Sequence, residues 1–123
     1  MKILNWDVDP VPKPRMTRRD KWKKRPVVER YYAFKDALRL LAARDKFTLP
    51  EEYEIDFFVA MPKSWSKVRK KAMDGNPHKN KPDLDNFIKA FQDALMDEDS
   101  YVHSIKATKR WSYEGKIVIS TQK

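Results

Sequence analysis

Cysteine is absent from this chain of 123 residues, which excludes disulfides, thiolate metal sites and cysteine nucleophiles. Any metal ion must therefore be held by oxygen or imidazole ligands. A long apolar run is also missing: the N-terminal segment is too short in apolar residues for a signal peptide, and no segment approaches the roughly 20 apolar residues of a membrane span. We expect a soluble, cytoplasmic protein.

Acidic residues are outnumbered by basic ones. Lysine and arginine total 27 against 18 aspartates and glutamates, which gives a net charge of +9. Such a balance favours a polyanionic partner, with nucleic-acid phosphates as the first candidate. The basic residues occur in runs, which argues against a merely solvated basic surface.

The apolar pattern predicts one α+β domain spanning residues 1–123, with a mixed β-sheet flanked by two longer α-helices. Alternating apolar residues at 53–61 indicate a half-buried strand, and spacings of three and four indicate helices. We expect strands at 3–8, 53–61, 101–111 and 116–121, longer helices at 26–44 and 84–96, and a short helix between Ser64 or Ser66 and Asp74. The last two strands should form a C-terminal hairpin across residues 112–115.

A basic segment follows three prolines that exclude regular structure, Pro10, Pro12 and Pro14. Cations with an interleaved aromatic side chain are suited to phosphate contact combined with base stacking. A flexible, solvated loop is the alternative interpretation. The predicted DNA-contacting residues, which include two from the later polar loop, are Arg15, Arg18, Arg19, Trp22, Lys23, Lys24, His78 and Lys81.

Carboxylates gather at the start of the helix expected at 84–96. Asp83 and Asp85 lie there, with Lys89 one turn further on. Helix capping would explain one of these acids but not all of them. Asp97 and Asp99 follow the last turn of the same helix, where the helix dipole disfavours negative charge.

A few aspartates on a basic surface are sufficient to hold Mg²⁺, with Mn²⁺ as an alternative, for phosphodiester hydrolysis. In such a site Lys89 would offset charge that develops on the phosphate. Lys89 is equally well explained as an intrahelical partner of Asp85 and Asp93.

A longer motif sharpens this reading. It runs Asp83-Leu84-Asp85-Asn86, Lys89-Ala90 and Asp93-Ala94-Leu95, followed by Glu98-Asp99-Ser100 and Val102. The pattern resembles the signature of RusA-type Holliday junction resolvases, small homodimeric endonucleases of phages and prophages. The resemblance implies that Asp83, Asp85 and Asp99 are metal ligands and that Lys89 is an essential catalytic lysine. The turn after the helix is shorter than in many relatives, so Asp97 remains an alternative third carboxylate.

The resemblance further implies a magnesium-dependent endodeoxyribonuclease that resolves four-way junctions by paired symmetric nicks in recombination and repair, in a bacterial or phage-infected cell. Two alternatives are a non-catalytic basic nucleic-acid-binding module and a nuclease that acts mainly on forks or flaps. A helix from Asp85 to Met96 is roughly 17 Å long, at 1.5 Å per residue, so Asp99 cannot meet Asp83 if the helix is straight and alone. Either the chain doubles back or a second subunit supplies the missing acid. Our hypothesis is a homodimer that completes each site across a two-fold axis.

Overall fold

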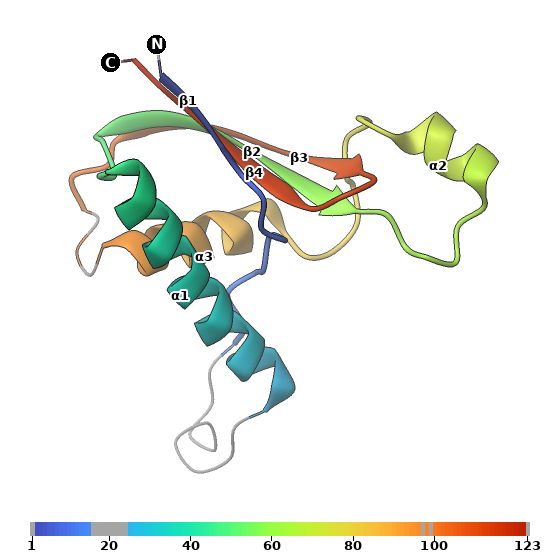
Figure 1. The fold of residues 1–123 in the computed structure, drawn as a ribbon, viewed down its shortest axis with the longest axis horizontal. Coiled ribbons are helices and arrows are strands. Elements are labelled where there is room, and N and C mark those ends of the chain that lie inside the picture. The colour runs from blue at the N-terminus through green and yellow to red at the C-terminus, as the bar shows by residue number, and fades with distance from the viewer. Residues whose placement is uncertain (1, 16–24, 97, 99, 123) are drawn as a thin grey trace.

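The computed structural model describes residues 2–15, 25–96, 98 and 100–122. Its described part contains a four-stranded sheet in the order β1-β4-β2-β3 (Figure 1). The strands are β1 (Lys2–Trp6), β2 (Glu52–Ala60), β3 (Ser104–Ser112) and β4 (Lys116–Thr121). β2 pairs in parallel with β3 and antiparallel with β4, while β1 pairs antiparallel with β4. The predicted mixed sheet is confirmed.

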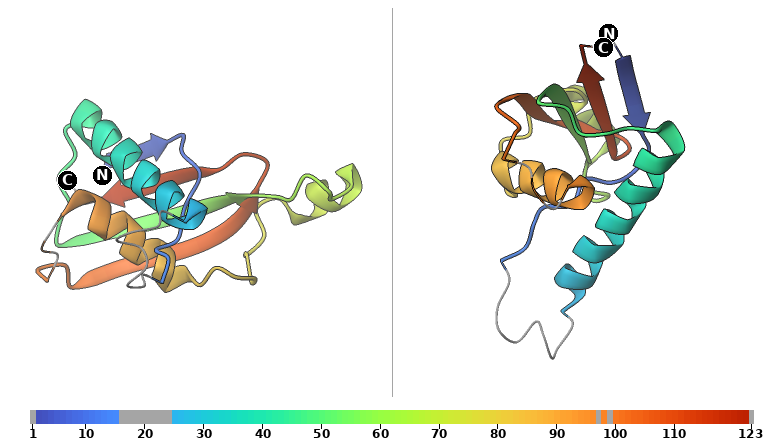
Figure 2. Two further views of the ribbon diagram at one scale, coloured as in Figure 1. Left: turned by 90° about the horizontal axis from the view of Figure 1, so that it is seen from below. Right: turned by 90° about the vertical axis from the view of Figure 1, so that its left-hand side faces the viewer.

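Two long helices, α1 (Pro26–Asp45) and α3 (Leu84–Leu95), cover one face of this sheet (Figure 2). A short helix, α2 (Lys67–Met73), projects beyond the end of the sheet. The predicted α+β class with two longer helices is therefore confirmed. Within the described ranges, no helix combines the length and apolarity needed to cross a membrane.

The predicted C-terminal hairpin is wrong, although both of its strands exist. β3 and β4 are not neighbours, because β2 lies between them and pairs with each. Residues 113–115 therefore cross the end of β2 instead of closing a two-stranded turn. This order places β2 in the interior of the sheet, where its fully buried Ile55 and Phe57 lie opposite the equally buried Ile119 and Ile117 of β4. Burial of β2 on both edges outweighs the local preference for a hairpin.

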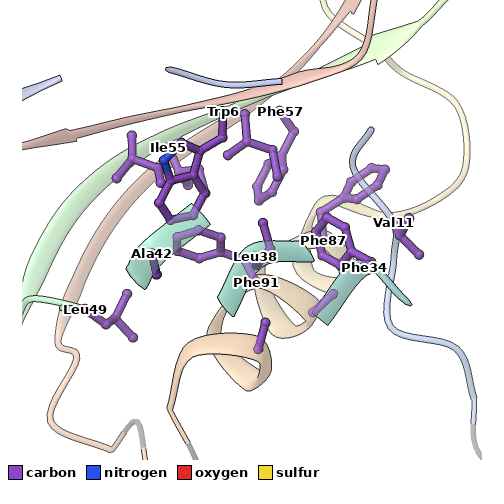
Figure 3. Packing of buried hydrophobic residues seen from close by; sticks show 14 of the residues in the cluster. Trp6, Val11, Phe34, Leu38, Ala42, Leu49, Ile55, Phe57, Phe87 and Phe91 are labelled. Carbon is purple, nitrogen blue, oxygen red and sulfur yellow. The ribbon is translucent and has the colours of Figure 1, made fainter. Parts of the chain in front are cut away.

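The core lies between the sheet and the two helices (Figure 3). Phe87 of α3 stacks on Phe57 of β2 with ring centroids 5.3 Å apart. One turn further along, Phe91 lies 5.7 Å from the ring of Tyr53 and 6.3 Å from that of Trp6. Aromatic side chains bury large apolar areas, so these contacts determine which face of α3 points inward.

Polar side chains connect the helices to their surroundings at the margins of this core. The Tyr53 hydroxyl donates a 2.6 Å hydrogen bond to Oε1 of Gln92. Nε of Arg39, on α1, donates to the carbonyl oxygen of Ala94 at 2.9 Å, which satisfies one of the last carbonyls of α3. These bonds fix the position of α3 along its axis.

We expect Phe91→Ala to lower the free energy of unfolding by about 3–5 kcal/mol, because the substitution leaves a cavity among fully buried rings. Urea denaturation followed by fluorescence measures the change. The control is Leu40→Ala, whose side chain is 73% exposed on α1 and whose loss should stay within about 0.5 kcal/mol. Equal losses in the two variants would contradict the assignment of the core.

Candidate functional site

Asp83 occupies the N-cap position of α3 without acting as a side-chain cap. Its backbone is extended, with φ −68° and ψ 148°, and its carboxylate makes no capping hydrogen bond. The first turn is instead closed through the backbone, where the amide of Asn86 donates to the carbonyl oxygen of Asp83 at 3.1 Å. Capping therefore does not account for this carboxylate, which remains exposed to solvent.

Asp85 lies in the first turn of α3 and pairs with Lys89. Nζ of Lys89 is 3.5 Å from Oδ2 of Asp85, and the two side chains are 60% and 65% exposed. Such exposed pairs between adjacent turns contribute only about 0.3–0.5 kcal/mol. Both groups thus remain accessible to an incoming ligand.

The alternative interpretation of Lys89 as an intrahelical partner holds for Asp85. Among the described residues, the ion pair of Asp93 is made with Lys13 and not with Lys89. Nζ of Lys13 contacts Oδ2 of Asp93 at 2.7 Å, and the Tyr31 hydroxyl donates to the same oxygen at 3.2 Å. Burial, reinforced by the charge of Asp93, raises the pKa of Tyr31 above its ordinary value. Asp93 is therefore a structural anchor between α3, α1 and the N-terminal segment.

The N-terminal segment lies against α3 through Lys13. Its amide donates to the carbonyl oxygen of Asn86 at 3.0 Å, and the nearby Val11 is buried in the core. These contacts hold the chain beside α3, the helix that carries Asp85. Arg15, two residues after Lys13, is exposed. The basic segment predicted to contact DNA thus begins next to the carboxylates.

Lys109 of β3 holds the loop that leads into Asp83. Its Nζ donates to the carbonyl oxygens of Asn80 and Pro82, at 2.6 and 2.7 Å. Pro82 is directly adjacent to Asp83, so this one ammonium group orients the approach to the helix start. The role of Lys109 could not be predicted from the sequence, because a lysine in a basic strand carries no local sign that its partners are distant backbone carbonyls.

His78 lies in the interior, which argues against the predicted phosphate contact. The side chain is only 4% exposed, and its ring centroid is 4.1 Å from that of Trp111. Its amide also donates to the carbonyl oxygen of Lys109 at 2.9 Å. Burial, assisted by the positive charge of Lys109, lowers the pKa of His78. A neutral, stacked imidazole is a packing element of the loop.

The other predicted residues fall into two groups. Lys81, like Arg15, is exposed and available to a ligand. Seven residues lie outside the described ranges, so their predicted roles stay predictions: Arg18, Arg19, Trp22, Lys23, Lys24, Asp97 and Asp99. In the part of the chain that the structure describes, no three histidine or acidic side chains gather in a possible metal cluster. The described part thus offers two exposed carboxylates at the start of α3.

Comparison with known families places the chain in the class of endodeoxyribonucleases. The family model described as Endodeoxyribonuclease RusA matches residues 7–122. The chain belongs to the RusA family. A search of curated proteins finds no match.

The buried imidazole of His78 makes stability depend on pH. Since its folded pKa lies below the ordinary value of 6.5, the unfolded chain binds a proton that the folded chain does not, and stability falls as the pH drops below about 6.5. We expect His78→Phe to remove the part of the pH dependence that comes from His78. That part is a slope in the free energy of unfolding of at most about 1.4 kcal/mol per pH unit. Urea denaturation between pH 5 and 8 measures it.

The control for this experiment is His103→Gln. His103 is the only other histidine of the chain and is exposed, so its replacement should leave the acid-side slope in place. An unchanged slope in His78→Phe would show that His78 is not the group responsible.

Proposed function

We propose that this RusA-family protein is a magnesium-dependent nuclease that resolves four-way DNA junctions by paired nicks. The observation that carries the proposal is the exposed Asp83 carboxylate, which is not used for capping and stands at the start of the helix that carries the exposed Asp85–Lys89 pair. Capping leaves the Asp83 carboxylate unexplained. Asp83 and Asp85 lie at the N-terminal, electropositive end of α3, which favours an approaching phosphate.

The donor set fits a hard divalent cation. Asp83 and Asp85 offer carboxylate oxygens, the ligands that Mg²⁺ prefers, and the chain has no thiolate to offer. Asp99 is the proposed third ligand, with Asp97 as its alternative, and Mn²⁺ is a plausible substitute for Mg²⁺. When bound, the cation would polarise a phosphoryl oxygen and lower the pKa of an attacking water.

The protein's own groups then have separate tasks. Lys89, whose pair with Asp85 is solvent-exposed, would stabilise negative charge on the phosphate as the bond breaks. Lys109 would keep the loop before Asp83 in place through its two carbonyl contacts. Arg15, Lys81 and the cations between residues 16 and 24 would bind the DNA backbone, with Trp22 stacking on an opened base.

The proposed third ligand, Asp99, follows α3 in the sequence, whereas Asp83 precedes this helix. The helix has 12 residues and is therefore roughly 18 Å long. Glu98 and Ser100, the described neighbours of Asp99, follow its C-terminal end. We therefore propose a homodimer in which Asp99 completes the partner subunit's site, an arrangement that would also place two sites on one junction.

Asp83→Asn is the direct test of the enzyme. We expect cleavage of a synthetic four-way junction to fall by roughly 10³-fold, because several kcal/mol of transition-state stabilisation depend on the bound cation. Junction binding should be retained or tightened, because the substitution removes a negative charge near the phosphates. Gel assays with Mg²⁺, with Mn²⁺ and with chelator measure both properties.

The matched control is Asp36→Asn, which removes an acid that is 76% exposed on α1 and should cleave normally. Unchanged cleavage by Asp83→Asn would refute the enzymatic role and favour a non-catalytic binding module. A parallel panel of forks and flaps decides which branched substrate is cut fastest.

Mixing Asp83→Ala and Asp99→Ala subunits tests the shared site. If Asp99 acts in the partner's site, each heterodimer contains one site with both acids intact, and about half of the dimers in a random mixture are heterodimers. We expect the mixture to nick one strand per junction, although each variant alone is inactive. If the mixture recovers no nicking, Asp99 acts within its own subunit.

A further inference from the structure

A second basic surface lies outside the site described above, on α2 and the residues around it. We call residues 63–74 the basic arm. The ribbon of α2 stands away from the rest of the molecule (Figure 1). None of the α2 residues is buried, and Val68 is 81% exposed. A helix of seven residues is not stable by itself in water. Contacts at its base must therefore hold the arm in position.

Those contacts are made with the C-terminal end of β3. The amide of Gly75 donates to the carbonyl oxygen of Trp111 at 2.9 Å. The amide of Trp111 in turn donates to the carbonyl oxygen of Asn76 at 3.0 Å. Nη1 of Arg110 donates to the carbonyl oxygen of Gly75 at 3.0 Å. The positive φ of 82° at Gly75 suits glycine and lets the chain turn back from α2 onto this strand.

Aromatic rings strengthen the same connection. Trp65 lies 4.8 Å from Trp111 between ring centroids, and the guanidinium of Arg69 lies 3.9 Å above the Trp65 ring. With His78 on Trp111, these groups form a continuous series of tilted ring contacts from the arm to the buried part of the loop. The Ser66 side chain also caps α2 by accepting from the amide of Arg69 at 3.1 Å. The arm is thus fixed in an outward position.

The charge of the arm is concentrated on one helical face. Lys70 and Lys71 follow Lys67 by three and four positions, a spacing that places both of them next to Lys67 on the same side of α2. No acid lies within α2, and none of the ion pairs among the described residues involves these three lysines. Their ammonium groups therefore have no acidic partner in the described part of the molecule.

The arm and the proposed catalytic carboxylates share one support. Lys109 holds the loop before Asp83, and the next two residues of β3, Arg110 and Trp111, hold the base of the arm. A hydrogen-bonded strand therefore determines the distance from the lysine face to Asp83. A ligand that spans both would meet a preorganised surface.

We propose that Lys67, Lys70 and Lys71 bind the sugar-phosphate backbone of a duplex arm of the DNA whose strand lies at Asp83. This inference rests on the proposed nuclease function and adds a binding surface to it. Three lysines on flexible stems suit a row of phosphates, because point charges need no bidentate geometry. The contact would be independent of base sequence and would position the duplex for cleavage.

The test is the triple variant Lys67→Gln, Lys70→Gln and Lys71→Gln, measured on a four-way junction without metal at several salt concentrations. Glutamine keeps the helix propensity of lysine, so folding should not change. We expect affinity at moderate salt to fall about tenfold or more, and the slope of log K against log salt to decrease by about two to three units, one for each lost phosphate contact. Single-turnover cleavage at subsaturating protein should fall together with the affinity, because fewer junctions are bound.

The matched control removes three cations near the opposite end of the sheet: Lys2→Gln, Lys46→Gln and Lys106→Gln. It loses the same net charge, so an equal loss of affinity in both variants would mean that only overall charge matters and would overturn the proposal. An unchanged salt slope in the arm variant would overturn it as well. In either case magnesium-dependent cleavage by the wild-type protein would leave the nuclease function standing. If the wild-type protein does not cleave and the arm variant still shows a reduced salt slope, the nuclease function is refuted and DNA binding by the basic arm is supported.

Discussion

The packing of α3 on β2 is the constraint on which the candidate site depends. Phe87 stacks on Phe57, and Phe91 packs against Tyr53 and Trp6, so one face of the helix is committed to the core. Because an α-helix places side chains at 100° intervals, this commitment leaves Asp85 and Lys89 exposed on the surface. One helix therefore both closes the core and presents acidic side chains to solvent. Its core contacts and the residues of the candidate site lie on different faces.

The C-terminal end of β3 has a corresponding role for the segments that lack a core of their own. The loop before Asp83 and the basic arm bury little apolar surface, and they are held by hydrogen bonds and ring contacts to three consecutive residues, Lys109, Arg110 and Trp111. Surface segments of a basic protein repel one another, so such specific contacts are needed to hold these cationic segments on one strand.

Local patterns in the sequence were sufficient to predict the secondary structure and to single out the acids at the start of α3 as candidate site residues. Alternation located β2, helical spacing located α1 and α3, and the acids around Asp83 were recognised as more than capping residues. The hairpin prediction failed because it assumed that neighbours in sequence pair in the sheet, whereas burial of Ile55 and Phe57 favours β2 in the interior. The prediction for His78 failed because its partner, Trp111, is distant in the sequence and covers the ring.

The amino-acid sequence by itself determined the charge of the surface, the absence of thiol ligands and the position of Asp83, Asp85 and Lys89 around one helix start, because these follow from composition and from periodicity over a few residues. Only the tertiary structure decided that the Asp83 carboxylate is not used for capping, that Asp93 is occupied by Lys13 and Tyr31, and that Lys109 supports the loop from 27 and 29 residues away. These features depend on hydrogen bonds between segments whose proximity arises when the core forms, and no local pattern encodes that proximity.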